Sequence, residues 1–347
     1  MPTVADRETL IAAFLAANGW TGARWAPLAG DASFRHYYRL AQGSRRAVLM
    51  DAPPMQEDIR PFVAVARHLK SLGFSAPEVL AEDLDAGLLL LEDLGDDTYT
   101  KVLAATGGAK AAVLEDELYG LAVDVLIQLH KLPPARAVPK GIPNYGNGRL
   151  LDEAFLLPQW YAPAIAGKPM SEAQRKAYGE AWLAAFPVVH AGPKTLVLRD
   201  YHVDNLMLLK DRAGAARCGL LDFQDAVRGH PAYDLMSLLE DARRDIRPAL
   251  RRTMLDRYAA AFPGLDRDAF ERAFRVLAAQ RHAKVIGIFT RLCVRDKKPA
   301  YLVHIPRVWR LLEQALAEPA LEPVADWFRA NVPADERKAP ADPAAVA

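Results

Sequence analysis

The sequence predicts an α+β chain of two lobes, with a β-rich N-terminal lobe and a mostly helical C-terminal lobe. Short strand-like runs separated by turns occupy residues 1–94, whereas long amphipathic segments fill most of the chain beyond them. At 347 residues the chain is long for one domain and sufficient for two lobes. We assign the N-terminal lobe to residues 1–94, the C-terminal lobe to 95–332, and a flexible Pro/Ala-rich tail to 333–347.

The composition excludes several classes of function. The net charge of +1 predicts no bulk attraction to nucleic acid or to an anionic membrane, and no apolar run has the length of a membrane span. Charged residues 6–8 interrupt the N-terminus, so it predicts a helix and not a signal peptide. The two cysteines, Cys218 and Cys293, lie in no metal-binding motif. We therefore expect a cytoplasmic protein without a zinc site.

The N-terminal lobe is predicted to be a small antiparallel sheet with one helix packed on it. Strands are predicted at residues 33–40, 45–51 and 87–97. In the first of these strands Arg35, Tyr37 and Arg39 share one face, because side chains alternate along a strand. A segment with helical apolar spacing runs from Ile59 and stops at Gly73.

The C-terminal lobe is predicted to be built from helices. The run "KAAVLEDELYGLAVDVLIQLHKL" is a long amphipathic helix that ends before two prolines. Further helices are predicted at about residues 232–243, 248–262, 268–292 and 305–317. The lobes join near residues 92–97, and clefts between lobes are favoured places for small-molecule sites.

A polar loop between two apolar runs, "TLVLRDYHVDNLMLL" at residues 195–209, is the most informative stretch. The apolar runs on either side of "KDRAGAAR" predict a hairpin, with its turn centred on residues 213–214. In that register Asn205 lies opposite Asp222, with Cβ atoms about 5 Å apart. Asp200 lies in the loop that enters the hairpin.

These side chains match the needs of phosphoryl transfer. Amide and carboxylate oxygens, as on Asn205 and Asp222, suit Mg²⁺, which also takes phosphate oxygens. Asp200 is then free to accept a proton from an attacking hydroxyl. Taken singly, each residue is also typical of an ordinary turn or helix cap. Their combination with the hairpin and the β-rich lobe favours the catalytic interpretation.

The segments "LRDYHVDN" and "LLDFQDAVRGHPAYDLMSLL" resemble the core of the aminoglycoside phosphotransferase and choline kinase family, which has a bilobal protein-kinase-like fold. The resemblance covers most of the chain. It implies that Asp200 is the catalytic base, that Asn205 and Asp222 bind Mg²⁺, and that ATP is the phosphate donor. It also implies that Asp234 braces the catalytic loop from the next helix. Because an Asp at a helix start can also be a cap, we class Asp234, with Arg199, as structural.

The same resemblance implies that the N-terminal lobe binds the nucleotide and that the C-terminal lobe carries catalysis and the substrate. "LEDLGD" would be the hinge, whose backbone binds the adenine edge. "AGDASFRHYYRL" would cover the phosphates, although it has one glycine and no GxGxxG motif. The residues expected at the nucleotide are Gly30, Ser33, Phe34, Val48, Glu92, Asp93, Leu94 and Leu221.

The sequence departs from the family pattern in two places. Leu198 stands where a His usually helps to hold the catalytic loop. Met50 stands where the phosphate-binding Lys is expected, and residues 59–72 contain no acid to pair with such a Lys. Losing both partners together avoids an unpaired buried charge. The replacement cations that the sequence offers are Arg35, Arg39 and Arg46. Otherwise the enzyme relies more on Mg²⁺, or the chain is a nucleotide-binding pseudokinase.

Three segments narrow the resemblance: "DASFRHYYRL", "MDAPP" and "DFQDAVRGHPAYDL". They are similar to the anomeric kinases of bacterial cell-wall recycling, which phosphorylate the C1 hydroxyl of N-acetylmuramate and N-acetylglucosamine. That subgroup also lacks the Lys at the position of Met50. The alternatives are an aminoglycoside or choline phosphotransferase and a catalytically silent pseudokinase. The presence of all three catalytic-core residues argues against the pseudokinase.

The expected partner is a small amino sugar, with no nucleic acid, membrane or obligate protein partner. Between Asp241 and Arg257 the sequence has six Arg and three Asp, which fits an anionic sugar better than a polycationic aminoglycoside. A solvated helix of mixed charge is the alternative for this segment. The residues proposed for the substrate are His202, Gln224, Asp225 and Trp160. His202 can equally cap its loop, and a Trp is more often part of a core.

Overall fold

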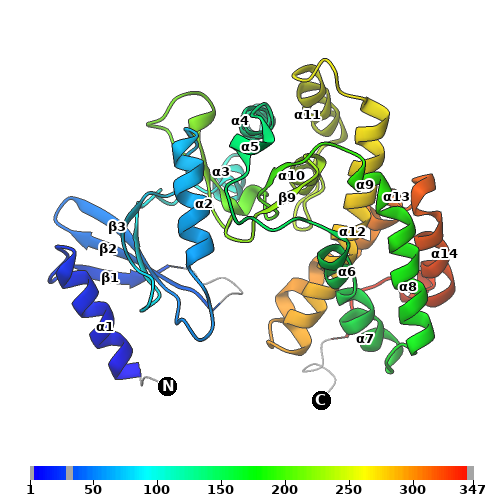
Figure 1. Cartoon of the computed structure of the whole chain (residues 1–347), viewed down its shortest axis with the longest axis horizontal. Helices are drawn as coiled ribbons and strands as arrows, with labels where there is room; N and C mark the ends of the chain where they lie inside the picture. The colour runs from blue at the N-terminus through cyan, green and yellow to red at the C-terminus, as the bar shows by residue number, and fades with distance from the viewer. Residues whose placement is uncertain (1–3, 29–33, 342–347) are drawn as a thin grey trace. The chain divides into compact units, whose positions relative to one another are not determined.

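The computed structural model describes residues 4–28 and 34–341, and the chain divides into two compact units. The first unit comprises Met1–Val125 and Val203–Ala226, and the second comprises Leu126–His202 and Val227–Ala347. The first unit contains the large sheet, and the second is mostly helical (Figure 1). The α+β class predicted from the sequence is therefore present.

The sheet of the first unit has five antiparallel strands in the order β1-β2-β3-β5-β4. The strands are β1 (Arg24–Pro27), β2 (His36–Gln42), β3 (Arg45–Asp51), β4 (Val79–Asp83) and β5 (Leu88–Leu91). β3 has the predicted bounds, whereas β2 begins and ends later than predicted. The two edge strands β1 and β4 were not predicted, because they are short and mostly exposed and show no apolar alternation.

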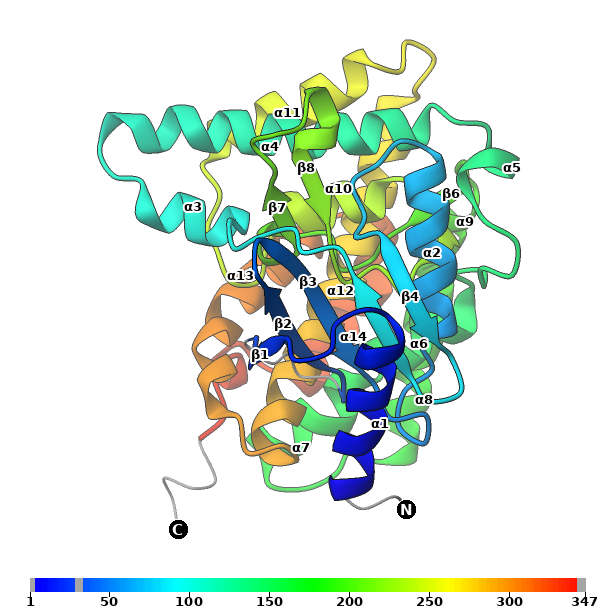
Figure 2. The ribbon, with the colours of Figure 1, turned by 90° about the vertical axis from the view of Figure 1, so that its left-hand side faces the viewer.

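Two helices cover opposite faces of this sheet. The helix α1 (Val4–Ala17) packs Ile11, Phe14 and Leu15 against a core that includes Leu40 and Leu49. Figure 2 shows α1 in front of the sheet. The helix α2 (Arg60–Ser71) lies on the other face, as Figure 1 shows, and buries its apolar stripe there.

The rest of the first unit consists of helices and a hairpin. Its elements are α3 (Tyr99–Ala105), α4 (Ala109–His130), η2 (Val203–Asn205), β7 (Leu206–Leu208), η3 (Gly214–Arg217) and β8 (Cys218–Leu220), and the boundary between the units falls within α4.

The register predicted for the hairpin was wrong by one residue. Leu206 pairs with Leu220, so Asn205 lies opposite Leu221 and not opposite Asp222. The shift arises because the turn is not centred on residues 213–214. Instead, residues 214–217 form a 3-10 turn on one side of the loop, which makes the connection asymmetric.

The second unit is built around the long helix α12 (Arg267–Val294), which packs against α6, α10 and α13 (Figure 1). Its other elements are α5 (Pro134–Ala137), α6 (Asn147–Ala154), η1 (Leu157–Tyr161), α7 (Ala162–Ala166), α8 (Glu172–Ala185), α9 (Pro187–His190), β6 (Thr195–Val197), β9 (Val227–Gly229), α10 (Ala232–Leu239), α11 (Pro248–Ala260), η4 (Pro299–His304), α13 (Ile305–Ala315), η5 (Pro319–Leu321), α14 (Glu322–Asn331) and η6 (Ala334–Glu336). The helix predicted at 232–243 ends at Leu239, because Glu240 leaves helical geometry. Among the described residues, no helix is long and apolar enough to cross a membrane.

Candidate active site

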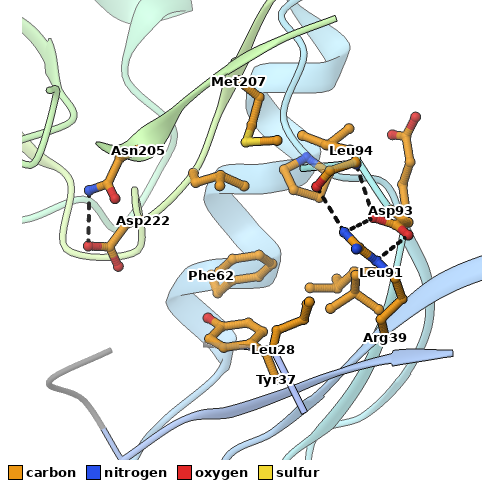
Figure 3. A pocket seen from close by; sticks show the side chains of 15 residues that line it. Leu28, Tyr37, Arg39, Phe62, Leu91, Asp93, Leu94, Asn205, Met207 and Asp222 are labelled. Atoms are coloured by element: carbon orange, nitrogen blue, oxygen red, sulfur yellow. Dashed lines mark hydrogen bonds and ion pairs between the residues drawn. The ribbon is translucent and has the colours of Figure 1, made fainter. Parts of the chain in front are cut away.

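A pocket of about 360 Å³ lies in the first unit, on the sheet face that α2 covers (Figure 3). This volume falls within the range of small-molecule sites. Five of the residues predicted to contact a nucleotide line it, namely Val48, Glu92, Asp93, Leu94 and Leu221. The pocket also takes in Asn205 and Asp222, the predicted metal ligands.

The segment predicted to cover the phosphates is only partly described. Gly30 and Ser33 lie outside the described residues. Phe34 is described, but 57% of its surface is exposed and it does not line the pocket.

Several pocket residues were not singled out from the sequence. Tyr37 and Arg39 project from β2, Phe62 comes from α2 and Met207 comes from β7 (Figure 3). The alternation of β2 had already placed Tyr37 and Arg39 on one face. Phe62 stacks on Phe223, the residue after Asp222, with ring centroids 5.1 Å apart. Only the tertiary structure brings α2 and the hairpin to the same pocket.

Ion pairs hold the hinge segment against the sheet. Arg39 donates to Asp93 (3.0 Å), to the carbonyl oxygen of Gly95 (2.9 Å) and to Asp96 (2.7 Å). The backbone N–H of Glu92 donates to the carbonyl oxygen of Glu78 (2.9 Å). That one hinge N–H therefore pairs with the chain next to β4 and is not directed at a bound base.

Asn205 and Asp222 meet although they are not directly opposed in the hairpin. The Nδ2 of Asn205 donates to Oδ2 of Asp222 at 3.3 Å (Figure 3). Asp222 has φ of +58°, in the left-handed region that Asp tolerates better than most residues. The Nε2 of Gln224 donates to the other carboxylate oxygen of Asp222 at 2.8 Å. Three side chains thus converge at the end of the hairpin.

This donor set fits Mg²⁺. An amide oxygen and a carboxylate are hard ligands, and protein-bound Mg²⁺ usually has few protein ligands, with waters and phosphate oxygens completing its shell. No cluster of three or more His, Cys, Asp or Glu side chains suited to a metal occurs in residues 4–28 and 34–341. The arrangement therefore suits a metal that is bound by protein and nucleotide together. It does not suit a structural site in which the protein supplies every ligand.

The loop that carries Asp200 lies in the second unit and is held in an uncommon backbone conformation. Arg199, directly before it, has φ of +71°, a conformation that costs a non-glycine residue roughly 1–2 kcal/mol. Asp234 on α10 accepts the backbone N–H groups of Leu198 (2.7 Å) and Arg199 (2.9 Å). Ser237 Oγ donates to the carbonyl oxygen of Arg199 at 3.3 Å. These bonds from α10 hold the loop through its backbone. The loop is therefore held although Leu198 stands where a His is usual.

Glu153 on α6 is the centre of a buried network that sequence reasoning missed. Its carboxylate pairs with the guanidinium of Arg199 and with Lys284 Nζ (3.4 Å). It also accepts hydrogen bonds from the hydroxyl of Tyr145 and from Nε2 of Gln280 (3.2 Å). Two of these partners, Gln280 and Lys284, lie on the long helix α12 and are buried. Their burial follows from the central place of α12, which the sequence pattern did not reveal.

The charges around Asp200 keep its carboxylate ionised. Burial raises the pKa of Asp200, but the cations of Lys284, Arg199 and Arg281 outweigh burial and lower the pKa below its usual range. Burial lowers the pKa of His202, and Asp241 only partly offsets this effect, so its ring is neutral near pH 7. An ionised Asp beside a neutral His suits proton acceptance.

The residues that the sequence analysis proposed for the substrate lie in different surroundings. His202 is 6% exposed, and Gln224 is engaged with Asp222. Asp225 is exposed. Trp160 is half-buried in the π-helical turn η1 of the second unit.

We predict that Asp234→Asn destabilises the catalytic loop. One of the two backbone N–H groups would then face an amide NH₂ in place of a carboxylate oxygen, and a lost buried hydrogen bond costs about 1–3 kcal/mol. Urea unfolding measures the loss, and turnover should fall with it. Asp152→Asn, an exposed acid on α6, is the matched control and should change stability by about 0.5 kcal/mol or less. Equal stability of the two variants would show that Asp234 does not hold the loop.

Sequence comparison relates the chain to phosphate-transferring enzymes. The profile described as "Phosphotransferase enzyme family" matches residues 24–270. A protein from Caulobacter vibrioides named N-acetylmuramate/N-acetylglucosamine kinase is 37% identical over 370 residues, covering 97% of this chain and 100% of the relative. A protein of the same name from Pseudomonas aeruginosa is 39% identical over 310 residues, covering 87% of each chain.

Solved structures share the fold at low sequence identity. A choline/ethanolamine kinase family protein from Mesorhizobium loti gives a TM-score of 0.59 at 16% identity, covering 95% of this chain and 100% of that one. The choline kinase LicA from Streptococcus pneumoniae gives 0.61 at 12% identity, covering 89% and 99%. The ADP-bound aminoglycoside phosphotransferase APH(2″)-Ib gives 0.58 at 16% identity, covering 90% and 99%. The predicted bilobal kinase-like fold is thus confirmed.

Proposed function

Because this chain belongs to the phosphotransferase enzyme family, we propose that it transfers the γ-phosphoryl group of ATP to the C1 hydroxyl of N-acetylmuramate, N-acetylglucosamine or both. One observation carries the choice of substrate: a relative named for these sugars is 37% identical over 97% of this chain and over its own full length. The aminoglycoside and choline kinases are 12–16% identical, so their likeness supports the fold and not their substrates. A sugar 1-phosphate made in the cytoplasm would serve cell-wall recycling.

The pocket of the first unit is the proposed nucleotide site. Apolar side chains such as Val48 and Leu221 offer a slot for a flat base, next to the hinge at residues 92–94. Asn205 and Asp222 would hold Mg²⁺, which when bound neutralises phosphate charge during transfer. Three donors already converge on Asp222, so its carboxylate is positioned before a ligand arrives.

Asp200 is the proposed base. Its carboxylate accepts the proton of the sugar hydroxyl as the C1 oxygen forms a bond to the γ-phosphorus and the bond to the ADP oxygen breaks. The lowered pKa keeps this carboxylate ready at neutral pH, and the hydrogen bonds from α10 orient its loop. His202, Gln224, Asp225 and Trp160 remain the residues proposed to contact the sugar.

³¹P NMR of the purified protein with Mg-ATP tests this function. N-acetylmuramate, N-acetylglucosamine, kanamycin and choline are offered separately, and we expect a sugar 1-phosphate signal with ADP release for the first two. The methyl glycoside of N-acetylglucosamine is the matched control, because its C1 oxygen carries no proton to transfer. Phosphate on kanamycin or choline would refute the substrate assignment. Phosphate on the methyl glycoside would refute the C1 assignment.

A further inference from the structure

The strand position that would carry a phosphate-binding lysine is closed to that role. Met50 on β3 is 0% exposed, and it is paired with Tyr37 of β2 on one side and with Leu89 of β5 on the other. Nucleotide phosphates still require positive charge from the protein or the metal. A first unit that binds ATP therefore uses a cation from another position, or relies more on the metal.

The three arginines that the sequence offers as replacement cations have different surroundings in the structure. Arg39 is engaged with Asp93, Asp96 and Gly95 at the hinge. Arg46 is exposed and donates to the carbonyl oxygens of its own hairpin, at Gly43 and Arg45 (both 3.2 Å). Arg39 lines the pocket on the side opposite Asn205 and Asp222 (Figure 3), and Arg46 does not line it.

Arg35 differs from both. It is 7% exposed, and its Nη2 lies 3.4 Å from Oδ1 of Asp222. Its Nε lies 3.7 Å from Oε1 of Glu57. Arg35 lies just before β2, two residues from Tyr37 and four from Arg39, which both line the pocket. A buried guanidinium thus lies between a carboxylate at the pocket and a carboxylate just before α2.

We propose that Arg35, positioned by Glu57, is the cation that binds the nucleotide phosphates in place of a lysine on β3. A phosphate that shares a metal with Asp222 comes within reach of the guanidinium that already touches this carboxylate. Arginine can present two parallel N–H donors to one phosphate, which a lysine cannot do. The inference rests on the proposed nucleotide-dependent function and names the residues that serve it.

Glu57 explains the missing acid of α2. Residues 59–72 hold no acid, because Glu57, the acidic partner of Arg35, stands before the helix begins at Arg60. Glu57 is partly exposed and lies at Nε of Arg35, whereas Asp222 lies at Nη2. We therefore class Glu57 as a positioning residue and Arg35 as the residue that touches the phosphates.

Calorimetric titration with ADP and with adenosine tests the proposal, each in Mg²⁺ and in EDTA. For Arg35→Met we expect ADP affinity to fall about 10- to 100-fold, in line with the loss of a charged hydrogen bond. Adenosine has no phosphate, so its affinity should stay within about twofold if only phosphate contacts are lost. Arg46→Met is the matched control and should bind both ligands like the wild type.

Three further variants separate loss of phosphate contacts from a folding defect. Arg35→Lys keeps one charge and should recover part of the ADP affinity, with adenosine affinity again unchanged. Glu57→Gln should weaken ADP several-fold and adenosine not at all, and Glu57→Asp should restore part of the loss. A purely structural role for Glu57 would lower both affinities together.

The proposal is overturned if Arg35→Met binds ADP as tightly as the wild type, or more tightly, with adenosine affinity unchanged. Arg35 would then serve only to neutralise Asp222. It is also overturned if Arg35→Lys loses adenosine and ADP affinity equally. These outcomes are independent of the NMR assay. If the wild type transfers no phosphate to either sugar but ADP binding depends on Arg35, the substrate proposal fails and this one stands.

Discussion

Asp200→Asn is expected to abolish turnover while leaving the fold and nucleotide binding intact. The amide has nearly the shape of the carboxylate but cannot accept the hydroxyl proton, and loss of a general base typically costs 10²- to 10⁴-fold in rate. ADP release in the presence of sugar measures the rate, and ADP titration measures binding. Asp211→Asn, at the exposed turn of the hairpin, is the matched control and should keep the wild-type rate. A wild-type rate for Asp200→Asn would show that another group is the base.

The pH profile gives a second readout for the same residue. A base acts only when ionised, and the surrounding cations hold the pKa of Asp200 below the usual carboxyl range. The activity of the wild type should therefore persist down to acid pH and fall only as pH drops through this lowered pKa. The residual activity of Asp200→Asn should lack that acid limb. An acid limb of kcat/KM near pH 6 to 7 in the wild type would contradict this assignment.

Asp222→Asn is expected to uncouple nucleotide binding from Mg²⁺. The variant keeps the size of the side chain but loses the negative charge that a hard cation requires. Metal-ion catalysis supplies several kcal/mol, so we expect turnover to fall about a thousandfold. Asp85→Asn, a surface acid whose side chain is 98% exposed, is the control.

The decisive measurement for Asp222→Asn is ADP affinity with and without Mg²⁺. Wild-type affinity should rise when Mg²⁺ is added, whereas the variant should bind ADP equally in both conditions. The substitution also removes one of the two carboxylates that neutralise Arg35, namely Asp222, and leaves Glu57. Because Arg35 then attracts phosphate more strongly, metal-free ADP affinity should rise slightly. An unchanged response to Mg²⁺ would show that Asp222 is not a metal ligand.

The sequence by itself determined the order and type of the main elements. Helices such as α2 and α13 have clear periodicity, because each buries one apolar stripe and exposes the opposite face. It also determined where the polar loop lies, because Asp200 and Asn205 stand between two apolar runs. The short exposed strands β1 and β4 carry no such pattern and were missed for that reason.

Tertiary structure alone decided which distant groups meet. The pairing of Arg35 with Glu57 and Asp222, and the burial of Glu153 beneath Arg199, join segments that are far apart in the chain. Local pattern cannot report such contacts, because a charged residue has the same periodicity whether solvent or another chain segment covers it. The register of the hairpin was missed for a similar reason. An asymmetric turn shifts the pairing by one residue without changing the composition of either strand.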